Sequence, residues 1–238
     1  LSQFTAEEIR DNGCLAVWVG VESFQTGENT TEDQYQKRRG KEIKELFADL
    51  HRHNIQTVGS LVLGFDFHNR ENLKEDIDQF VALKPLLYQI SPLTPCPGTP
   101  LYERMMEEGR ILDTYQWEDF HLWKDEVFQL KNLKKGEVKE LFDYAHRKLR
   151  DENGPQALQF MESALDAIKG LRDKTDEFHR EQARKLKMAA KGALAYVRAV
   201  KKLHPSPLVR ERALMLERRA KDEIGGAPVF AEMGANFI

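Results

Sequence analysis

The residues best suited to metal or redox chemistry are two cysteines, Cys14 and Cys96, which stand 82 positions apart. A structural zinc site or an iron–sulfur cluster takes three or four protein ligands, so these two thiols alone supply neither. Two cysteines also make no disulfide framework, which favours reduced thiols and a cytoplasmic location.

Histidines and carboxylates form two short groups that could move protons or bind metal. His51 and His53 are two positions apart near the end of an expected helix, so they point to different faces. A favourable interaction with the helix dipole is preferred there over a metal site. Asp66 and His68 place an acid and a base in one segment. An ordinary surface loop is favoured for it over a proton-transfer role.

The elements that position these residues alternate between strands and helices. Short apolar runs rich in β-branched residues occupy 14–24, 55–65 and 85–94 and predict buried strands. Between them, 41–53 and 70–83 carry apolar residues at helical spacing. This β-α-β-α-β order predicts an α/β fold in which 15–22, 56–63 and 87–91 are adjacent parallel strands and both helices cover one face.

After Pro100 the pattern becomes helical. We expect a short helix at 101–109 and longer helices at 136–152, 155–203 with a break near Gly170, and 207–223. Large apolar side chains lie between the two halves of the chain, and their density predicts that the helical region packs on the α/β part: Trp117, Phe120, Leu122, Trp123, Val127 and Phe128.

Four segments together resemble the second half of a radical S-adenosylmethionine (SAM) core of the cobalamin-binding branch. They are Val19-Gly-Val-Glu-Ser23, Lys37-Arg-Arg-Gly40, the passage from His53 to Phe65, and Gln89-Ile-Ser-Pro-Leu-Thr-Pro-Cys-Pro-Gly-Thr-Pro-Leu-Tyr102. The resemblance covers about 13–112 and implies a partial (βα) barrel at 1–112. The helical patterns predict an all-α region at 113–224, and glycines and a proline without any period predict a flexible tail at 225–238.

The chain departs from that family where the family holds its cluster. The loop of three cysteines, the first three strands and the cobalamin-binding segment have no counterpart. The resemblance therefore implies a C-terminal portion or subunit of a longer enzyme that performs methyl transfer or another C–H functionalisation. The missing half or a partner subunit would carry the 4Fe-4S cluster and, in this branch, cobalamin, and the substrate would be a small molecule or a lipid.

The resemblance also implies a SAM site at the carboxyl ends of the strands. Glu22 would accept hydrogen bonds from the ammonium or ribose of SAM, one of the basic residues near Lys37 would bind its carboxylate, and Ser60 would contact the ribose. Gly64 would make room for the adenosyl group. The alternatives are an ion pair of Glu22 with a neighbouring basic residue, a hydrogen bond of Ser60 with the backbone, and a plain tight turn at Gly64. The implied site comprises Glu22, Ser23, Lys37, Arg38, Ser60, Gly64 and Gln89.

Charge and hydropathy limit other functions. The chain has no run of about 18 apolar residues, so no membrane-spanning helix is expected. Residues 170–224 hold 15 Lys and Arg against 8 Asp and Glu, a net charge of +7, yet a solvated helical face is favoured over nucleic-acid binding. The alternative to an enzyme is a non-catalytic helical scaffold or binding module that retains part of an α/β domain.

Overall fold

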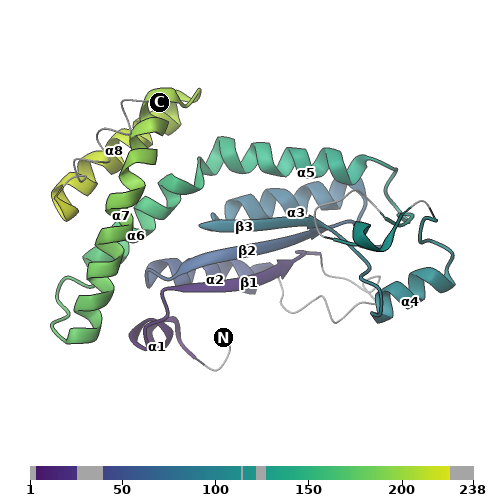
Figure 1. Cartoon of the computed structure of the whole chain (residues 1–238), viewed down its shortest axis with the longest axis horizontal. Coiled ribbons are helices and arrows are strands. Elements are labelled where there is room, and N and C mark those ends of the chain that lie inside the picture. The colour runs from purple at the N-terminus through teal and green to yellow at the C-terminus, as the bar shows by residue number, and fades with distance from the viewer. Residues whose placement is uncertain (1–3, 26–39, 114, 122–126, 226–238) are drawn as a thin grey trace.

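The computed structural model describes residues 4–25, 40–113, 115–121 and 127–225. Its sheet has three parallel strands, β1 (Ala16–Glu22), β2 (Gln56–Leu63) and β3 (Leu87–Pro92), in the spatial order β1-β2-β3. The predicted strands, their order and their direction are confirmed (Figure 1). Among the described residues no further strand continues this sheet, and the partial barrel stays a prediction.

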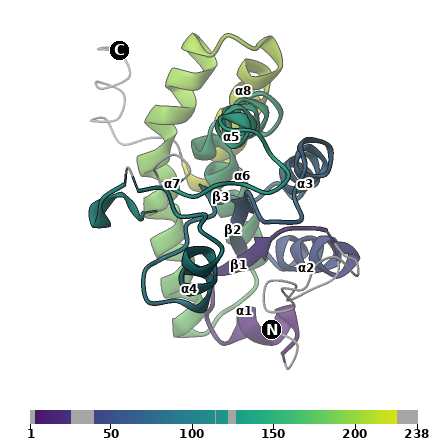
Figure 2. The ribbon, with the colours of Figure 1, turned by 90° about the vertical axis from the view of Figure 1, so that its right-hand side faces the viewer.

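Both crossover helices cover the same face of the sheet, as expected. These helices are α2 (Gly40–Arg52) and α3 (Arg70–Ala82), and Figure 2 shows them together on one side of the strands. Alternate strand residues such as Leu61 and Ile90 bury their side chains in a core with both helices. Asn69 caps α3, because its side chain accepts a hydrogen bond from the Asn72 N–H at 2.9 Å.

The opposite face of the sheet is more open. Strand residues alternate between two faces, so the neighbours of the buried residues point away from α2 and α3. On this face Trp18 is 63% exposed and Leu87 is 43% exposed. We call it the open face, and its residues are Trp18, Gly20, Glu22, Val58, Ser60, Val62, Leu87 and Gln89.

A smaller apolar cluster closes the carboxyl ends of the strands. It joins Phe65 to α4 (Pro100–Glu107) and to Val127 and Phe128, which are each 2% exposed. Packing of the apolar segment on the α/β part is thus observed for these two residues. Trp117, in the short helix η1 (Trp117–Asp119), is instead 74% exposed, and Leu122 and Trp123 lie outside the described residues.

The helical region divides its packing between two cores. Helix α5 (Glu137–Lys148) shares the core of the sheet, and one π-turn (η2, Leu149–Asn153) leads on to α6 (Gln156–Gly170). Helices α6, α7 (Glu177–Leu203) and α8 (Pro207–Ile224) form a separate core beyond the amino ends of the strands (Figure 1). The expected break near Gly170 is confirmed, and the domain boundaries stay a prediction.

One helix, α1 (Ala6–Asp11), was not expected from the apolar pattern. Its signal is a capping box, in which Thr5 and Glu8 bind each other's backbone N–H groups. In the part of the chain that the structure describes, no helix combines the length and apolarity needed to cross a bilayer.

Candidate functional site

Three of the residues predicted for the site lie side by side on the open face. The register places Gly20 of β1 beside Ser60 of β2, and Ser60 beside Gln89 of β3. Glu22 follows Gly20 after an irregularity in the pairing, at the carboxyl end of β1. A carboxylate, a hydroxyl and a primary amide therefore lie in one row across three strands.

The backbone at Glu22 turns its carboxylate back over this row. Its φ of 61° is in the left-handed region, which is uncommon for a residue with a side chain. A Cβ added at Gly20 would stand 2.5 Å from Glu22 Oε1 and 3.8 Å from Ser60 Oγ. The carboxylate thus occupies the space that the absent side chain of Gly20 leaves, next to Ser60.

This row matches a ligand with several hydrogen-bonding groups. A carboxylate accepts charge-assisted hydrogen bonds from an ammonium or from hydroxyls, and a hydroxyl and an amide can each both donate and accept. Backbone strain of the kind found at Glu22 tends to occur at functional sites. In open α/β sheets, ligands bind at the carboxyl ends of the strands. Glu22 is the last residue of β1, while Ser60 and Gln89 lie in the middle of β2 and β3.

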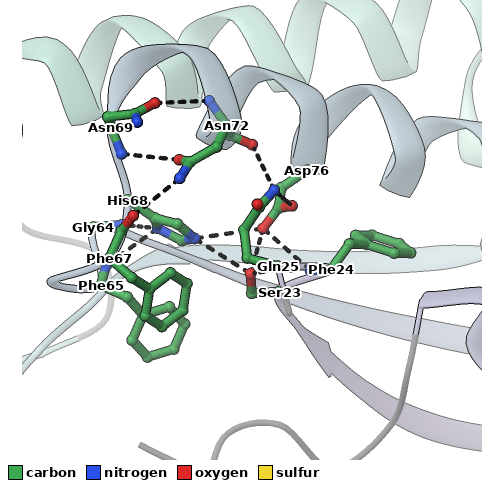
Figure 3. Close-up of polar contacts among 10 residues, drawn as sticks. All are labelled: Ser23, Phe24, Gln25, Gly64, Phe65, Phe67, His68, Asn69, Asn72 and Asp76. Carbon is green, nitrogen blue, oxygen red and sulfur yellow. Dashed lines mark hydrogen bonds and ion pairs between the residues drawn. The ribbon is translucent and has the colours of Figure 1, made fainter. Parts of the chain in front are cut away.

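Ser23 points elsewhere, into a buried network beneath α3 (Figure 3). Its hydroxyl donates to Asp76 Oδ2 at 2.5 Å, and the Phe24 N–H donates to the same oxygen at 3.2 Å. The Gln25 amide donates to Asp76 Oδ1 at 2.7 Å. Asp76 is fully buried, so these donors compensate for the loss of water around its carboxylate. Ser23 therefore anchors the segment that follows Glu22.

His68 extends this network to the end of β2. Its Nδ1 accepts hydrogen bonds from the N–H groups of Gly64 and Phe65, at 3.1 and 3.2 Å. Its Nε2 lies 3.4 Å from both Ser23 Oγ and Asp76 Oδ2. The network, which we call the Asp76 clamp, thus joins the ends of β1 and β2 to α3, and it consists of Ser23, Gln25, His68 and Asp76 (Figure 3).

The Asp76 clamp contains a serine, a histidine and an aspartate but lacks the geometry of a catalytic triad. In a triad, the aspartate and the serine bind different ring nitrogens of the histidine. Here both lie near Nε2 of His68, while backbone groups occupy Nδ1. The Ser23 proton is directed at Asp76 and not at the histidine. The arrangement therefore holds the strand ends in place and does not activate a nucleophile.

Gly64 belongs to this structural arrangement. Its φ is +100°, which suits glycine, and an added Cβ would meet Leu130 and Val138 at 3.4 Å. These neighbours support the tight-turn alternative at this position. Lys37 and Arg38, the expected contacts of the SAM carboxylate, lie outside the described residues.

An ion-pair cluster lies next to the clamp, at the carboxyl ends of the strands. Arg110, 7% exposed, binds both carboxylate oxygens of Asp66, at 3.0 and 2.6 Å. Burial alone would raise the pKa of the Asp66 carboxyl, but hydrogen bonds from Arg110 and Lys131 outweigh burial and hold that pKa below its usual range. Asp66 is therefore an ionised structural group that ties the end of β2 to the segment after α4.

A cavity of about 530 Å³ lies at the other end of the sheet, among α2, β2, α6 and α8. His51 lines it and shares a 3.0 Å hydrogen bond with Thr57. Burial, followed by the charge of Lys84, lowers the pKa of the His51 imidazole. Arg212, which also lines the cavity, is already bound to Glu162 and to the carbonyl of Asn153. Arg212 and Glu162 are thus already paired with each other, and the row of Glu22, Ser60 and Gln89 remains the candidate site.

The described residues offer no binding site for a metal ion or a cluster. No group of three or more His, Cys, Asp or Glu side chains among them is placed to hold a metal ion. Cys14 precedes β1 and its thiol donates to the Ala16 carbonyl at 3.2 Å, while Cys96 is exposed after β3. The two thiols thus lie beyond opposite ends of the sheet and do not fit a shared cluster.

Two features of the site were missed from the sequence. His68 is fully buried, so the expected surface loop is wrong for this residue. Asp76 had no predicted role, although it shares a helix face with Leu73, Ile77 and Phe80. An acid on an otherwise apolar helix face is the signal that could have indicated a buried partner.

Similarity to known proteins is confined to part of the chain. No protein-family model matches the chain. A stretch of 128 residues is 26% identical to the bacteriochlorophyllide d C-12(1)-methyltransferase of Chlorobaculum tepidum. The match covers 54% of this chain and 27% of that relative, so the chain spans well under two thirds of the relative's length. Over about half of its length, this chain is therefore similar to part of a methyltransferase.

Proposed function

We propose that the open face forms one wall of a SAM site in a methyl-transfer enzyme of the radical SAM type, with the sheet as part of a (βα) barrel. The observation that carries the proposal is the row of Glu22, Ser60 and Gln89, with the carboxylate folded over Gly20. The similarity to a methyltransferase supports the reaction class.

In this proposal each side chain orients one part of SAM. Glu22 accepts hydrogen bonds from the ammonium or the ribose hydroxyls, and Ser60, on the adjacent strand, contacts the ribose. Gln89 binds a polar edge of SAM or of the acceptor substrate, which is a small molecule or a lipid. The Asp76 clamp holds the ends of β1 and β2, and so fixes the position of the Glu22 carboxylate.

In this proposal SAM binds to this chain, and the other cofactors bind elsewhere. The donor set of the row fits SAM, which supplies the methyl group when bound. The described residues do not fit a 4Fe-4S cluster, so they take no part in holding a cluster or cobalamin. Both groups belong, in this proposal, to a partner subunit or to another part of a longer chain.

Equilibrium dialysis with labelled SAM tests the proposal, on this chain together with the partner subunit or further part that holds the cluster. Glu22→Gln removes the charge of the acceptor while keeping its shape, and the loss of one charge-assisted hydrogen bond should cost about 1.5–3 kcal/mol. That corresponds to a roughly ten- to hundredfold weaker dissociation constant.

The matched control is Glu75→Gln, which changes an exposed glutamate on α3. It should leave SAM binding unchanged. Equal affinities of the wild-type protein and Glu22→Gln would reject the site, and absence of saturable SAM binding to the wild-type protein would reject the proposed function.

A further inference from the structure

Helix α7 carries an unusual charge pattern. Residues 182–203 contain seven lysines and arginines and no aspartate or glutamate. A surface helix of a globular protein more often mixes both signs, which then pair along the helix. The seven basic residues are Arg184, Lys185, Lys187, Lys191, Arg198, Lys201 and Lys202.

Only some of this charge is neutralised. Glu217 of α8 binds Arg198 at 2.8 Å and also binds Lys201. At the amino end, Glu181 binds Arg184 at 2.7 Å. Lys187 and Lys202 are exposed, and they form none of the ion pairs found among the described residues.

The outer surface of α7 also exposes large apolar side chains. Met188 is 60% exposed, Tyr196 is 69% exposed and Leu203 is 54% exposed. Gly192 lies between them, and a Cβ added there would meet no atom within 4 Å. Spacings of three and four residues place these positions on one face. We call this face the apolar strip, and it comprises Met188, Gly192, Tyr196, Ala199 and Leu203.

The apolar strip does not belong to the core of the helical region. The inner face of α7 already packs against α6 and α8 through Leu186, Leu194 and Val197, which are at most 7% exposed. A second row with helical spacing runs alongside the apolar strip. We call it the basic strip, and it comprises Arg184, Lys187, Lys191 and Lys202.

Adjacent apolar and basic strips have the pattern of a helix that lies on an anionic membrane surface. Such a helix buries its apolar side chains at the acyl boundary while lysines and arginines contact lipid headgroups. A tyrosine suits this boundary because its ring is apolar and its hydroxyl is polar. The helix would lie on the bilayer and not cross it, in agreement with the lack of a spanning helix among the described residues.

Other partners fit less well. In a dimer formed through this face, the basic strips would approach each other and repel. A nucleic acid would match the charge, but unpaired bases are usually held by stacked aromatic rings, and Tyr196 is the one aromatic residue of the apolar strip. We therefore propose that the outer face of α7 docks the protein on a membrane surface rich in anionic phospholipid. This inference is independent of the proposed SAM site.

Vesicle sedimentation of the full chain tests the inference. We expect binding to vesicles of equal parts phosphatidylglycerol and phosphatidylcholine, weak binding to pure phosphatidylcholine, and loss of binding at high salt. The double variant Lys187→Glu/Lys191→Glu should bind anionic vesicles at least tenfold more weakly, because each lysine near such a surface contributes about 1 kcal/mol. Met188→Ser/Leu203→Ser should weaken binding while leaving the charge unchanged.

Matched controls lie on other helices. Met215→Ser changes a methionine of α8 that is 58% exposed, and Lys44→Glu changes an exposed lysine of α2. Both should bind like the wild-type protein, and circular dichroism melting should show that every variant is folded.

Several results would overturn the inference. They are equal binding to anionic and neutral vesicles, equal losses in the controls, or full binding by Met188→Ser/Leu203→Ser. Binding to RNA that vesicles do not displace, and that the basic-strip variant abolishes, would instead assign the face to nucleic acid. A tryptophan introduced by Tyr196→Trp should shift its fluorescence to the blue on anionic vesicles, and an unshifted spectrum would exclude insertion of the apolar strip.

Discussion

Glu22 adopts a backbone conformation that a glycine would adopt with less strain. Its φ is 61°, and the other described residues besides glycine with a positive φ are Asn54, at 58°, and Lys84, at 51°. The left-handed region costs a residue with a Cβ about 1–2 kcal/mol. In the proposed function this carboxylate, which lies over the row, contacts the ligand.

Replacing Glu22 by glycine should therefore separate stability from binding. We expect Glu22→Gly to leave the free energy of unfolding unchanged or to raise it by up to about 1 kcal/mol, because relief of strain is partly offset by the greater freedom of glycine in the unfolded chain. Urea unfolding measures this, and SAM binding should be lost. Lys84→Gly is the control, with a similar stability effect and normal SAM binding. A loss of more than about 1 kcal/mol in Glu22→Gly would instead make the carboxylate a structural group.

At the scale of elements, α5 joins the helical region to the sheet through a histidine in an apolar contact. The His146 ring packs against Phe142, with ring centroids 4.4 Å apart, and against Tyr88 at 5.6 Å. Its Nε2 is buried with no hydrogen-bond partner among the described residues. Burial lowers the pKa of the His146 imidazole, and the opposing effect of Asp143 is smaller. The neutral ring is therefore the form that suits the packing of α5.

The pH dependence of stability should reflect this. Because the pKa of His146 is lower in the folded state, the unfolded chain binds more protons as the pH falls below about 6.5, so stability is present above that value and decreases below it. His146→Phe should make the unfolding free energy less dependent on pH between about 6.5 and 5. Some dependence should remain, since the pKa of His51 is also lowered by burial. Identical pH profiles of variant and wild-type protein in urea unfolding would contradict this account.

At the scale of the whole molecule, the two faces of the sheet differ in how much they contribute to folding. Leu61 is fully buried beneath the helices, whereas Trp18, on the neighbouring strand, is 63% exposed on the open face. In the proposed function the open face is an inner wall of a barrel, which further structure would cover.

Substitutions on the two faces should have very different effects on this chain. Leu61→Ala should lower the unfolding free energy by about 2–5 kcal/mol, because it creates a cavity in the core. Trp18→Thr should change it by at most about 0.5 kcal/mol, because little contact is lost. Denaturant unfolding of both variants provides the comparison. A large loss in Trp18→Thr would mean that the open face is covered in the protein as it exists in solution.

Local sequence pattern predicted most of the helices and strands. Apolar runs of β-branched residues predicted the three strands within a residue or two, and helical spacing predicted α2, α3 and the helices after residue 136. The β-α-β order then predicted parallel pairing, because crossovers of this length return the chain in the same direction. Glu22, Ser60 and Gln89 are proposed from the resemblance of their segments to a known family, and their role in binding stays a prediction.

Only the tertiary structure decided how those motifs meet. Ser23 and Asp76 are 53 positions apart, and no local period relates them. The register between β1 and β2 brings Ser60 beside Gly20, and the left-handed backbone at Glu22 brings its carboxylate over the same glycine. The sequence by itself determined the elements and their order, since these follow from hydrophobic periodicity within a dozen residues. Three features depend on how segments distant in the sequence pack into a core and on which surfaces they leave exposed to solvent. These features are the buried partner of Ser23, the open face and the apolar strip of α7.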